Sequence, residues 1–506
     1  MKGHPFLAWP MSRRGGRVSR GHSNRVDDGI LESLAYFHSQ DGESNRVSAP
    51  PPGERLRWAC FWLVDFVTPE VLQRTVEHLR SSPLDRGELP GTSETLSSWL
   101  DYARSAPLYR GSVNLPICAR PGAGWTPMVA CEDIPDGIDT IRVSLFSLTP
   151  GLQVVMAQFC LTGSGQRALG EVLAEPRSTE ALEQANGRVA FLEPIHQKRD
   201  GFRLARQTMH LEAGLWLGRH IPGVFAAKAE DQGAMPSCDF IVTRNRTPFP
   251  RRYDRRRGAE GFGDFMHAAG LDLSFETWES DVLPGFRLGL PKSEYDDPQT
   301  LTLAAREHHI SGFAEKTFGV DLLDRTSRKL HGAIDGLLIM WALHELARRY
   351  HAQLSEQRDR WRLHDATTVV GATDSVKDAM VVMDKVANSR IIARDLLLVT
   401  EPDHWLQRDH LTFHRVVPAL RKHYDDELHA ALIAVLRREA RTVDPLASDV
   451  EASTVTDSNL NVARSSLLLQ QKVVSLTRWL VGFTIGLFVL TVVLGFLTYL
   501  ALTKQG

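Results

Sequence analysis

The chain has few cysteines and almost no net charge. Five cysteines in 506 residues include no CxxC pair, which argues against a disulfide framework and against a cysteine-based zinc site. Fifty-nine Lys and Arg are balanced by sixty-one Asp and Glu, so the formal charge is only -2. This balance excludes a wholly basic nucleic-acid coat and an acidic solubilising chain. Any function that depends on charge must therefore be local.

The common catalytic motifs are also missing. The sequence contains no GxxxxGK[ST] loop, no GxSxG elbow, no EF-hand loop and no set of protein-kinase motifs. Nucleophilic and phosphoryl-transfer chemistry therefore have no recognisable motif here. The sequence favours a binding protein over an enzyme, and it assigns no cofactor.

Long hydrophobic runs are scarce, with a single exception. The N-terminus has several arginines but no apolar run after them, so we expect no secretory signal in this segment. Residues 479–502 read WLVGFTIGLFVLTVVLGFLTYLAL, twenty-four residues without a charge. At 1.5 Å per residue such a helix reaches about 36 Å, which is enough to span a bilayer. We therefore expect one transmembrane helix.

The basic residues around this run predict its orientation. Arg464, Lys472 and Arg478 precede it and only Lys504 follows it, so the positive-inside rule places the N-terminal part in the cytoplasm. Residues 503–506 would form a short non-cytoplasmic tail, giving a tail-anchored, single-pass topology. Forty-eight of the fifty-nine basic residues are arginine, a bias that favours a bacterial inner membrane.

Two glycines inside the run suggest self-association. Gly482 and Gly486 form a GxxxG motif, and small residues at this spacing allow two helix backbones to approach closely. The motif predicts a helix–helix contact in a homo-oligomer. Glycine is common in transmembrane helices, so the motif is also compatible with a lone helix.

The rest of the chain divides into segments of different composition. Residues 1–55 are rich in Arg, Gly, Ser and Pro and predict a disordered tail. Residues 56–325 predict a mixed domain, α+β or α/β, and residues 326–441 a region of long helices. A polar linker at 442–457 and a juxtamembrane helix at 458–478 would lead into the transmembrane helix.

Apolar patterns predict the individual elements of the mixed domain. Residues 56–67 form a nearly continuous apolar run typical of a buried strand, and Thr68-Pro69-Glu70 after it predicts a helix start. Residues 140–161 predict an antiparallel hairpin around Thr149-Pro150-Gly151, with its first strand half-buried. Further strands are expected at 238–243 and near 286–290.

Three amphipathic patterns predict the helices of the second region. They lie at 330–350, 376–387 and 416–435, the last with Pro418 near its start. Leu460, Leu467, Val474 and Val481 then repeat at a spacing of seven. Because the intervening positions are mostly polar, we interpret 458–478 as an ordinary helix leading into the membrane, with a coiled-coil stalk as the alternative.

A glycine turn offers a candidate nucleotide site. Gly163, Gly165 and Ala168 fit GxGxxA after an expected strand, and Glu193 could contact a ribose. The expected strand belongs to a hairpin rather than to a parallel βαβ unit, and Glu193 lies farther along the chain than the fingerprint requires. A plain strand-to-helix turn is the competing interpretation.

A histidine cluster offers a candidate metal site. Five histidines lie between His404 and His429, and His410 with His414 form an i, i+4 pair that one helix could present to a metal. No HExxH arrangement accompanies them, and His344-Glu345 lacks the second histidine of that motif. Histidines on a solvated helix face are the alternative.

Arginines are concentrated in one short segment. Seven lie between 244 and 257 with Phe249 and Tyr253 among them, an arrangement that can bind phosphates of lipid or nucleic acid. Since an anchor would hold the domain near an anionic surface, lipid headgroups are favoured over nucleic acid, and a solvated loop is the simplest alternative. The candidate residues are Arg251, Arg252, Arg255, Arg256 and Arg257.

Three functions remain open from the sequence. The first is a single-pass, tail-anchored membrane protein whose cytoplasmic region binds a ligand or an unidentified protein partner at the membrane. The second is a membrane-tethered enzyme that uses the glycine turn or the histidine cluster. The third is an oligomerising effector that perturbs the membrane.

Overall fold

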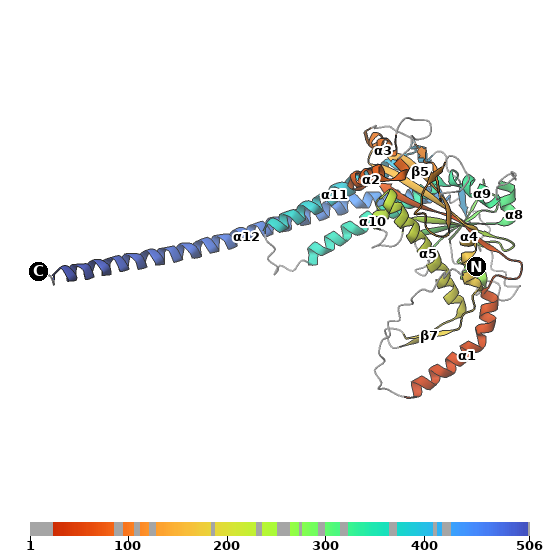
Figure 1. Ribbon diagram of the computed structural model, residues 1–506, viewed down its shortest axis with the longest axis horizontal. Coiled ribbons are helices and arrows are strands. Elements are labelled where there is room, and N and C mark those ends of the chain that lie inside the picture. Colours follow the sequence, from red (N-terminus) through yellow and green to blue (C-terminus); the bar gives the residue numbers. More distant parts are fainter. Residues whose placement is uncertain are drawn as a thin grey trace.

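The computed structural model describes residues 24–85, 95–105, 112–120, 128–183, 188–228, 235–249, 264–272, 276–291, 299–313, 322–363, 372–407, 412–416 and 427–503. A mixed α/β body lies at one end, and a single long helix extends away from it (Figure 1). The fold is therefore a sheet domain followed by helices and a C-terminal apolar helix, as the sequence predicts.

The described helices vary widely in length. They are α1 (Asn24–Ser48), α2 (Pro69–Ser81), α3 (Leu96–Ser105), α4 (Gly163–Ala174), α5 (Pro194–His220), α7 (Phe265–Ala268), α8 (Glu307–Phe313), α9 (Leu322–His331), α10 (Asp335–Leu363), α11 (Ala372–Val399) and α12 (Leu428–Thr503). Short 3-10 turns lie at Pro83–Asp85, Ala226–Lys228 and Trp405–Gln407.

Thirteen strands are described, and eleven of them form one sheet. They are β1 (Leu56–Val67), β2 (Ser112–Asn114), β3 (Ile117–Ala119), β4 (Met128–Ala130), β5 (Ile138–Thr149), β6 (Leu152–Leu161), β7 (Glu180–Glu183), β8 (Val189–Leu192), β9 (Ser237–Thr243), β10 (Glu276–Ser280), β11 (Arg287–Leu290), β12 (Thr300–Arg306) and β13 (Phe413–Arg415). The order is β13-β10-β11-β12-β9-β1-β6-β5-β3-β4, with β2 beside β5, and β7–β8 form a separate hairpin.

Strand β1 lies near the centre of the sheet. It pairs antiparallel with β6 and with β9, while β9 and β12 run parallel. Its apolar run is continuous because helices cover both faces of the sheet. Phe61 stacks on Phe159 with ring centroids 5.0 Å apart on the α5 side, and Trp62 Nε1 donates to His331 Nδ1 of α9 on the other side (3.1 Å). The sheet is thus the middle layer of three.

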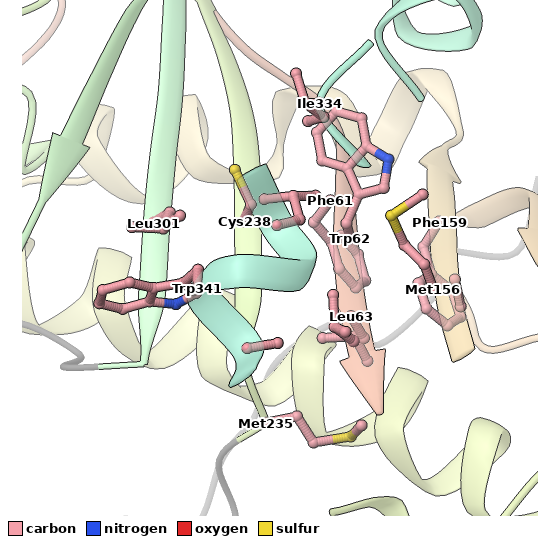
Figure 2. Packing of buried hydrophobic residues seen from close by; sticks show 14 of the residues in the cluster. Phe61, Trp62, Leu63, Met156, Phe159, Met235, Cys238, Leu301, Ile334 and Trp341 are labelled. Carbon is pink, nitrogen blue, oxygen red and sulfur yellow. The ribbon is translucent and has the colours of Figure 1, made fainter. Parts of the chain in front are cut away.

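The core joins the predicted mixed domain to the predicted helical region. Figure 2 shows side chains from β1, β6, β9 and β12 gathered with Ile334 and with Trp341 of α10 in one packed region. The same buried cluster extends from Leu56 to Ala440. A smaller cluster packs α10, α11 and α12 together around Val386, Val443 and Val450.

Several sequence predictions are confirmed, with one difference in burial. The strand at 56–67, the helix after Thr68 and the antiparallel hairpin of β5 and β6 are all present. The prediction that β5 is half-buried is wrong, because Ser144 is buried although it faces away from Val143 and Leu145. Helices on both sides of the sheet remove the exposed face that the alternation suggested.

The first 55 residues contain a helix where we expected disorder. Helix α1 docks through polar contacts: Asn45 Nδ2 donates to Arg177 O (2.6 Å), and Arg177 N donates to Asn45 Oδ1 (2.8 Å). Asp41 Oδ1 accepts from Thr179 Oγ1 (2.6 Å). A ring contact between Phe37 and Phe191, with centroids 4.8 Å apart, adds to these hydrogen bonds. A search for spaced apolar residues does not detect a helix that is held in part by hydrogen bonds.

The expected linker at 442–457 is also helical. It lies within α12, which runs without a break past Pro445. Val443, Leu446, Ala447, Val450 and Thr454 are buried on one side of this stretch, so its apolar face is narrow and its composition looks polar. Tertiary packing rather than hydrophobic content makes it part of the helix.

Two of the expected helices have different bounds. The pattern at 330–350 divides between α9 and α10, with a turn at Gly332. The third pattern begins at Val416, directly after strand β13, and helix starts only at Leu428, while residues 417–426 lie outside the described ranges. Strand β13 completes one edge of the sheet by pairing with β10.

A candidate ligand pocket between helices 10 and 12

A pocket with a chemically distinctive lining lies between α10 and α12. It has a volume of about 650 Å³. Its lining combines cations, carboxylates and one aromatic ring, from Phe225, Gln299, Glu345, Arg348, Arg349, His351, Ala352, Arg438, Glu439 and Thr442. Helix α10 forms one wall and α12 the other, and two loops from the sheet domain complete it.

The Phe225 loop is held in place by a buried carboxylate at the end of β1. Asp65 is fully buried and accepts hydrogen bonds from the backbone N–H groups of Phe66 (2.7 Å), Phe225 (2.8 Å) and Ala226 (2.8 Å). Burial raises the pKa of Asp65 to about 6, against the lowering effect of these bonds and of nearby Arg349. Gly223 makes the approach possible, because a Cβ there would lie 2.4 Å from the Asp65 carboxyl carbon.

Arg349 is the least satisfied cation of the pocket. Its guanidinium lies over the Phe225 ring, 4.9 Å from the centroid, which is a cation–π arrangement. Its Nε and Nη2 are buried and have no hydrogen-bond partner among the described residues. Burial lowers the pKa of Arg349, although Asp65 opposes the shift. A planar donor left in this state is suited to a carboxylate or phosphate oxygen.

The two carboxylates of the pocket are already paired with cations. His344 Nε2 lies 3.2 Å from Glu439 Oε1 on α12, and its Nδ1 lies 3.4 Å from Glu345 Oε1 on its own helix. Arg348 Nη1 donates to the same Glu345 oxygen (3.1 Å). Although burial lowers the pKa of His344, the two carboxylates raise it to about 9. His344 is therefore an imidazolium that bridges α10 and α12.

The charges that remain favour an anionic ligand. Glu345 and Glu439 are neutralised by His344 and Arg348, whereas neither Arg349 nor Arg438 forms an ion pair with a carboxylate of the described residues. A small molecule with phosphate or carboxylate groups would supply the missing acceptors. No group of three or more His, Cys, Asp or Glu side chains suited to a metal occurs among the described residues.

A second polar cluster lies beneath α5 and is closed. Asp239 of β9 is fully buried and accepts from Trp58 Nε1 (3.0 Å), His210 Nε2 (2.8 Å) and Arg206 Nε (2.6 Å). Arg206 also donates to Thr302 Oγ1 (3.2 Å). Burial alone would raise the pKa of Asp239, but Arg206 and His210 lower it. Each polar group has its partner, so this network ties α5 to the sheet.

A third cluster resembles a nucleophile–base pair but has the wrong tautomer. Ser144 Oγ lies 2.8 Å from His331 Nε2. Because Trp62 Nε1 donates to His331 Nδ1, the proton of the neutral imidazole must be on Nε2, which donates to Ser144. Burial lowers the pKa of His331 to about 4. His331 therefore cannot take a proton from Ser144 in this arrangement.

The glycine turn is built for close backbone packing. Gly163 and Gly165 form the first turn of α4, Ala168 lies one turn later, and Glu193 precedes a different helix, α5. Gly165 N already donates to Thr162 Oγ1 (3.1 Å). A Cβ on Gly165 would lie 2.5 Å from the Gly137 carbonyl oxygen. The strand before the turn, β6, is antiparallel to both neighbours, so the turn does not follow a parallel strand.

The histidine cluster is spread over different elements. His414 lies on strand β13, not on a helix, and its Nε2 lies 2.8 Å from Asp281 Oδ2. His410 lies outside the described residues, and His404 Nε2 lies 3.1 Å from Leu148 O. His429 Nε2 lies 3.0 Å from Gln407 Oε1. The sequence suggested that His414 and His410 form an i, i+4 pair on one helix, but His414 lies on a strand.

The remaining candidates are the arginine segment and the two glycines of the apolar run. Arg251, Arg252, Arg255, Arg256 and Arg257 fall in residues that the structure does not describe. Gly482 and Gly486 lie on α12, and a Cβ at either position would have no atom within 4 Å. Together with Arg478, Trp479 and Phe483 they line a shallow groove on the helix surface.

The sequence did not indicate the pocket. His344 and Glu345 drew attention only as a partial zinc motif, and the arginines at 348, 349 and 438 belong to ordinary charged helix faces. Two adjacent arginines on α10 (348–349) and two on α12 (437–438) were the only sign of the pocket in the sequence. The packing of the two helices brings arginines of both pairs together. No family model, curated protein or solved structure matches this chain.

Proposed function

We propose that this protein binds a small anionic ligand in the pocket between α10 and α12, and that the apolar end of α12 holds it in a membrane. The observation that carries the proposal is Arg349, with two buried donors that lack a partner among the described residues. Leaving such a donor unsatisfied costs about 1–3 kcal/mol, which a ligand oxygen would recover. Phe225, which lies beneath the guanidinium, also lines the pocket.

Helix α12 supports the membrane part of the proposal. Among the described residues it alone is long and apolar enough to cross a membrane, and its most apolar window is entirely exposed. A soluble helix with this composition would be expected to bury its apolar side chains. The excess of basic residues before residue 479 supports a cytoplasmic location of the sheet domain, and the arginine-rich composition supports a bacterial inner membrane.

The same helix links the two parts. Arg438, Glu439 and Thr442 line the pocket, and the helix that carries them continues to Thr503. An anion bridging Arg349 and Arg438 would strengthen the contact between α10 and α12. Ligand binding would in this way act on the helix that enters the membrane.

Thermal unfolding of the full chain in detergent tests the ligand site. Inorganic pyrophosphate and citrate serve as probes, and Arg349→Met is compared with Arg80→Met, which removes an exposed arginine on α2. A bound anion raises the unfolding temperature by mass action. We expect the increase in wild type and Arg80→Met and its loss in Arg349→Met. Equal responses in both variants would contradict the proposed site.

A further inference from the structure

Most of α12 has no neighbour in the described chain. The last buried positions are Val450 and Thr454, after which the helix leaves the body as an isolated rod (Figure 1). From Val455 to Arg478 there are twenty-four residues, about 36 Å of helix, before the uncharged run. Large apolar side chains of this stalk are exposed to solvent, which is unfavourable for a helix in water.

One series of eleven positions on this helix has an alternating spacing of four and three, and nine of its members are apolar. The series begins in the stalk and continues into the apolar run, with Val455, Asn459, Val462, Ser466, Leu469, Val473, Leu476, Leu480, Phe483, Leu487 and Leu490 as its members. Its large apolar members are 44% to 68% exposed. We call these eleven residues the stalk seam. Sustained over five heptads, this pattern is that of a coiled-coil seam.

We propose that the stalk seam pairs with the same seam of a second copy of this chain, forming a parallel two-stranded coiled coil that continues into the membrane. A second copy fits because both chains would enter the bilayer with the same end and to the same depth. Their helices would then be parallel and in register, so each seam residue meets its own counterpart. This inference rests on the membrane part of the proposed function but not on the ligand pocket.

The residue types in the stalk seam favour two strands. Val473 at a with Leu469 and Leu476 at d matches the preference of parallel dimers for a β-branched residue at a and leucine at d, and Leu480 at a departs from it. Asn459 also occupies an a position, where a polar pair fixes register and oligomer number at some cost in stability. Lys472 at g faces Thr477 at e of the partner, so no like charges oppose each other there.

Two other faces of the same helix could form the contact, and their residues differ from those of the stalk seam. Leu460, Leu467 and Val474 repeat at seven but lie at b positions, about 100° around the helix from the a positions. Gly482 and Gly486 fall at c and g, and close glycine packing would require a right-handed crossing instead of a left-handed coil. Each face therefore predicts a different set of residues at the contact.

Disulfide crosslinking in membranes identifies which face is used. Single cysteines are introduced into the full chain at Val462, Leu469, Val473 or Leu476, with Leu460→Cys, Leu467→Cys and Val474→Cys as matched controls. All five native cysteines are buried and free, so wild type provides the background. Two cysteines are bridged only when their Cα atoms lie within about 7 Å. Alkaline carbonate extraction of each variant measures membrane anchoring separately.

We expect a dimer band several-fold stronger at the seam positions than at the control positions, and no larger species. A maximum at the control positions, equal yields everywhere, or no crosslink in anchored protein would each overturn the proposal. Gly482→Ile with Gly486→Ile in the Leu469→Cys background should leave the yield unchanged, and its loss would assign the contact to the glycine face. Protein released by carbonate would instead count against the membrane anchor.

Discussion

Single charged side chains connect the layers of this molecule. Asp239 holds α5 to the sheet through Arg206, His210 and Trp58, and Asp65 holds the Phe225 loop. Both carboxylates are fully buried. Removing one member of a buried ion pair strongly destabilises the fold, because the other member remains buried without an opposite charge.

Replacing Asp239 should therefore be strongly destabilising. We expect Asp239→Asn to lower the free energy of unfolding by about 3–5 kcal/mol, since Arg206 and His210 would remain buried without their carboxylate. Urea unfolding of the full chain in detergent, followed by tryptophan fluorescence, measures the effect. Asp101→Asn is the control, because Asp101 pairs with Arg80 on an exposed surface. A loss no larger than that of the control would argue that the network contributes little.

The His344 bridge makes a prediction about pH. Its pKa is raised from 6.5 to about 9 in the folded protein, so its stabilisation is fully present below pH 6.5 and is lost as the pH rises through 9. Each pKa unit corresponds to about 1.4 kcal/mol. Unfolding temperatures measured from pH 6 to 10 should decline in wild type across this interval and decline less in His344→Gln. Parallel curves for the two proteins would show that the bridge carries no stability.

The first turn of α4 is constrained by backbone packing and needs no ligand to explain its glycines. The first turn of α4 begins with Gly163 and Gly165, yet only the second glycine is restricted by its neighbours. A Cβ on Gly165 would lie 2.5 Å from the Gly137 carbonyl oxygen, whereas one on Gly163 would approach only Arg167, at 3.6 Å. Backbone packing explains the second glycine, and the first has free space.

The two glycines should respond differently to the same substitution. Gly165→Ala should destabilise by about 1–3 kcal/mol because the clash with a backbone atom forces the turn to move. Gly163→Ala should be neutral or stabilising by up to about 1 kcal/mol, since alanine is favoured over glycine in helices. Unfolding of both variants without nucleotide provides the comparison. Similar losses in the two would mean that the turn is not limited by Gly137.

Elements with dense apolar patterns were predictable, and those held by polar contacts were not. The bounds of β1 follow from its uninterrupted run, and the β5–β6 hairpin follows from its turn residues. Helix α1 escaped prediction because Asp41 and Asn45 anchor it. The stalk seam escaped because it begins at Val455, inside what appeared to be a polar linker, and crosses the expected boundary at 478.

At the scale of the whole molecule, the order of the parts could be predicted but their association could not. The sequence shows an apolar run at residues 479–502 and a mixed domain before it. It does not show that α12 is one helix of 76 residues that lines the pocket and also carries the run. Contacts between α10 and α12 are distant in sequence, and only the folded core brings Arg349 near Arg438.

The location of the molecule can be tested without disturbing the pocket or the stalk seam. Val489→Arg with Val492→Arg places two charges in the middle of the apolar run, on positions outside the seam. Each arginine at a helix centre costs about 2.5–3.5 kcal/mol of insertion free energy. We expect the wild-type chain to stay with membranes after alkaline carbonate extraction and this variant to be released.

Leu468→Arg with Val474→Arg is the matched control, since it adds the same charge to the exposed stalk, also outside the seam. This variant should stay with the membrane, because its arginines lie before the apolar run and can remain in water or reach the lipid headgroups. Release of both variants would mean that added charge, not its position in the apolar run, causes extraction. Retention of both would mean that the run does not anchor the protein, and the long helix would then have to be explained by a protein partner along its whole exposed length.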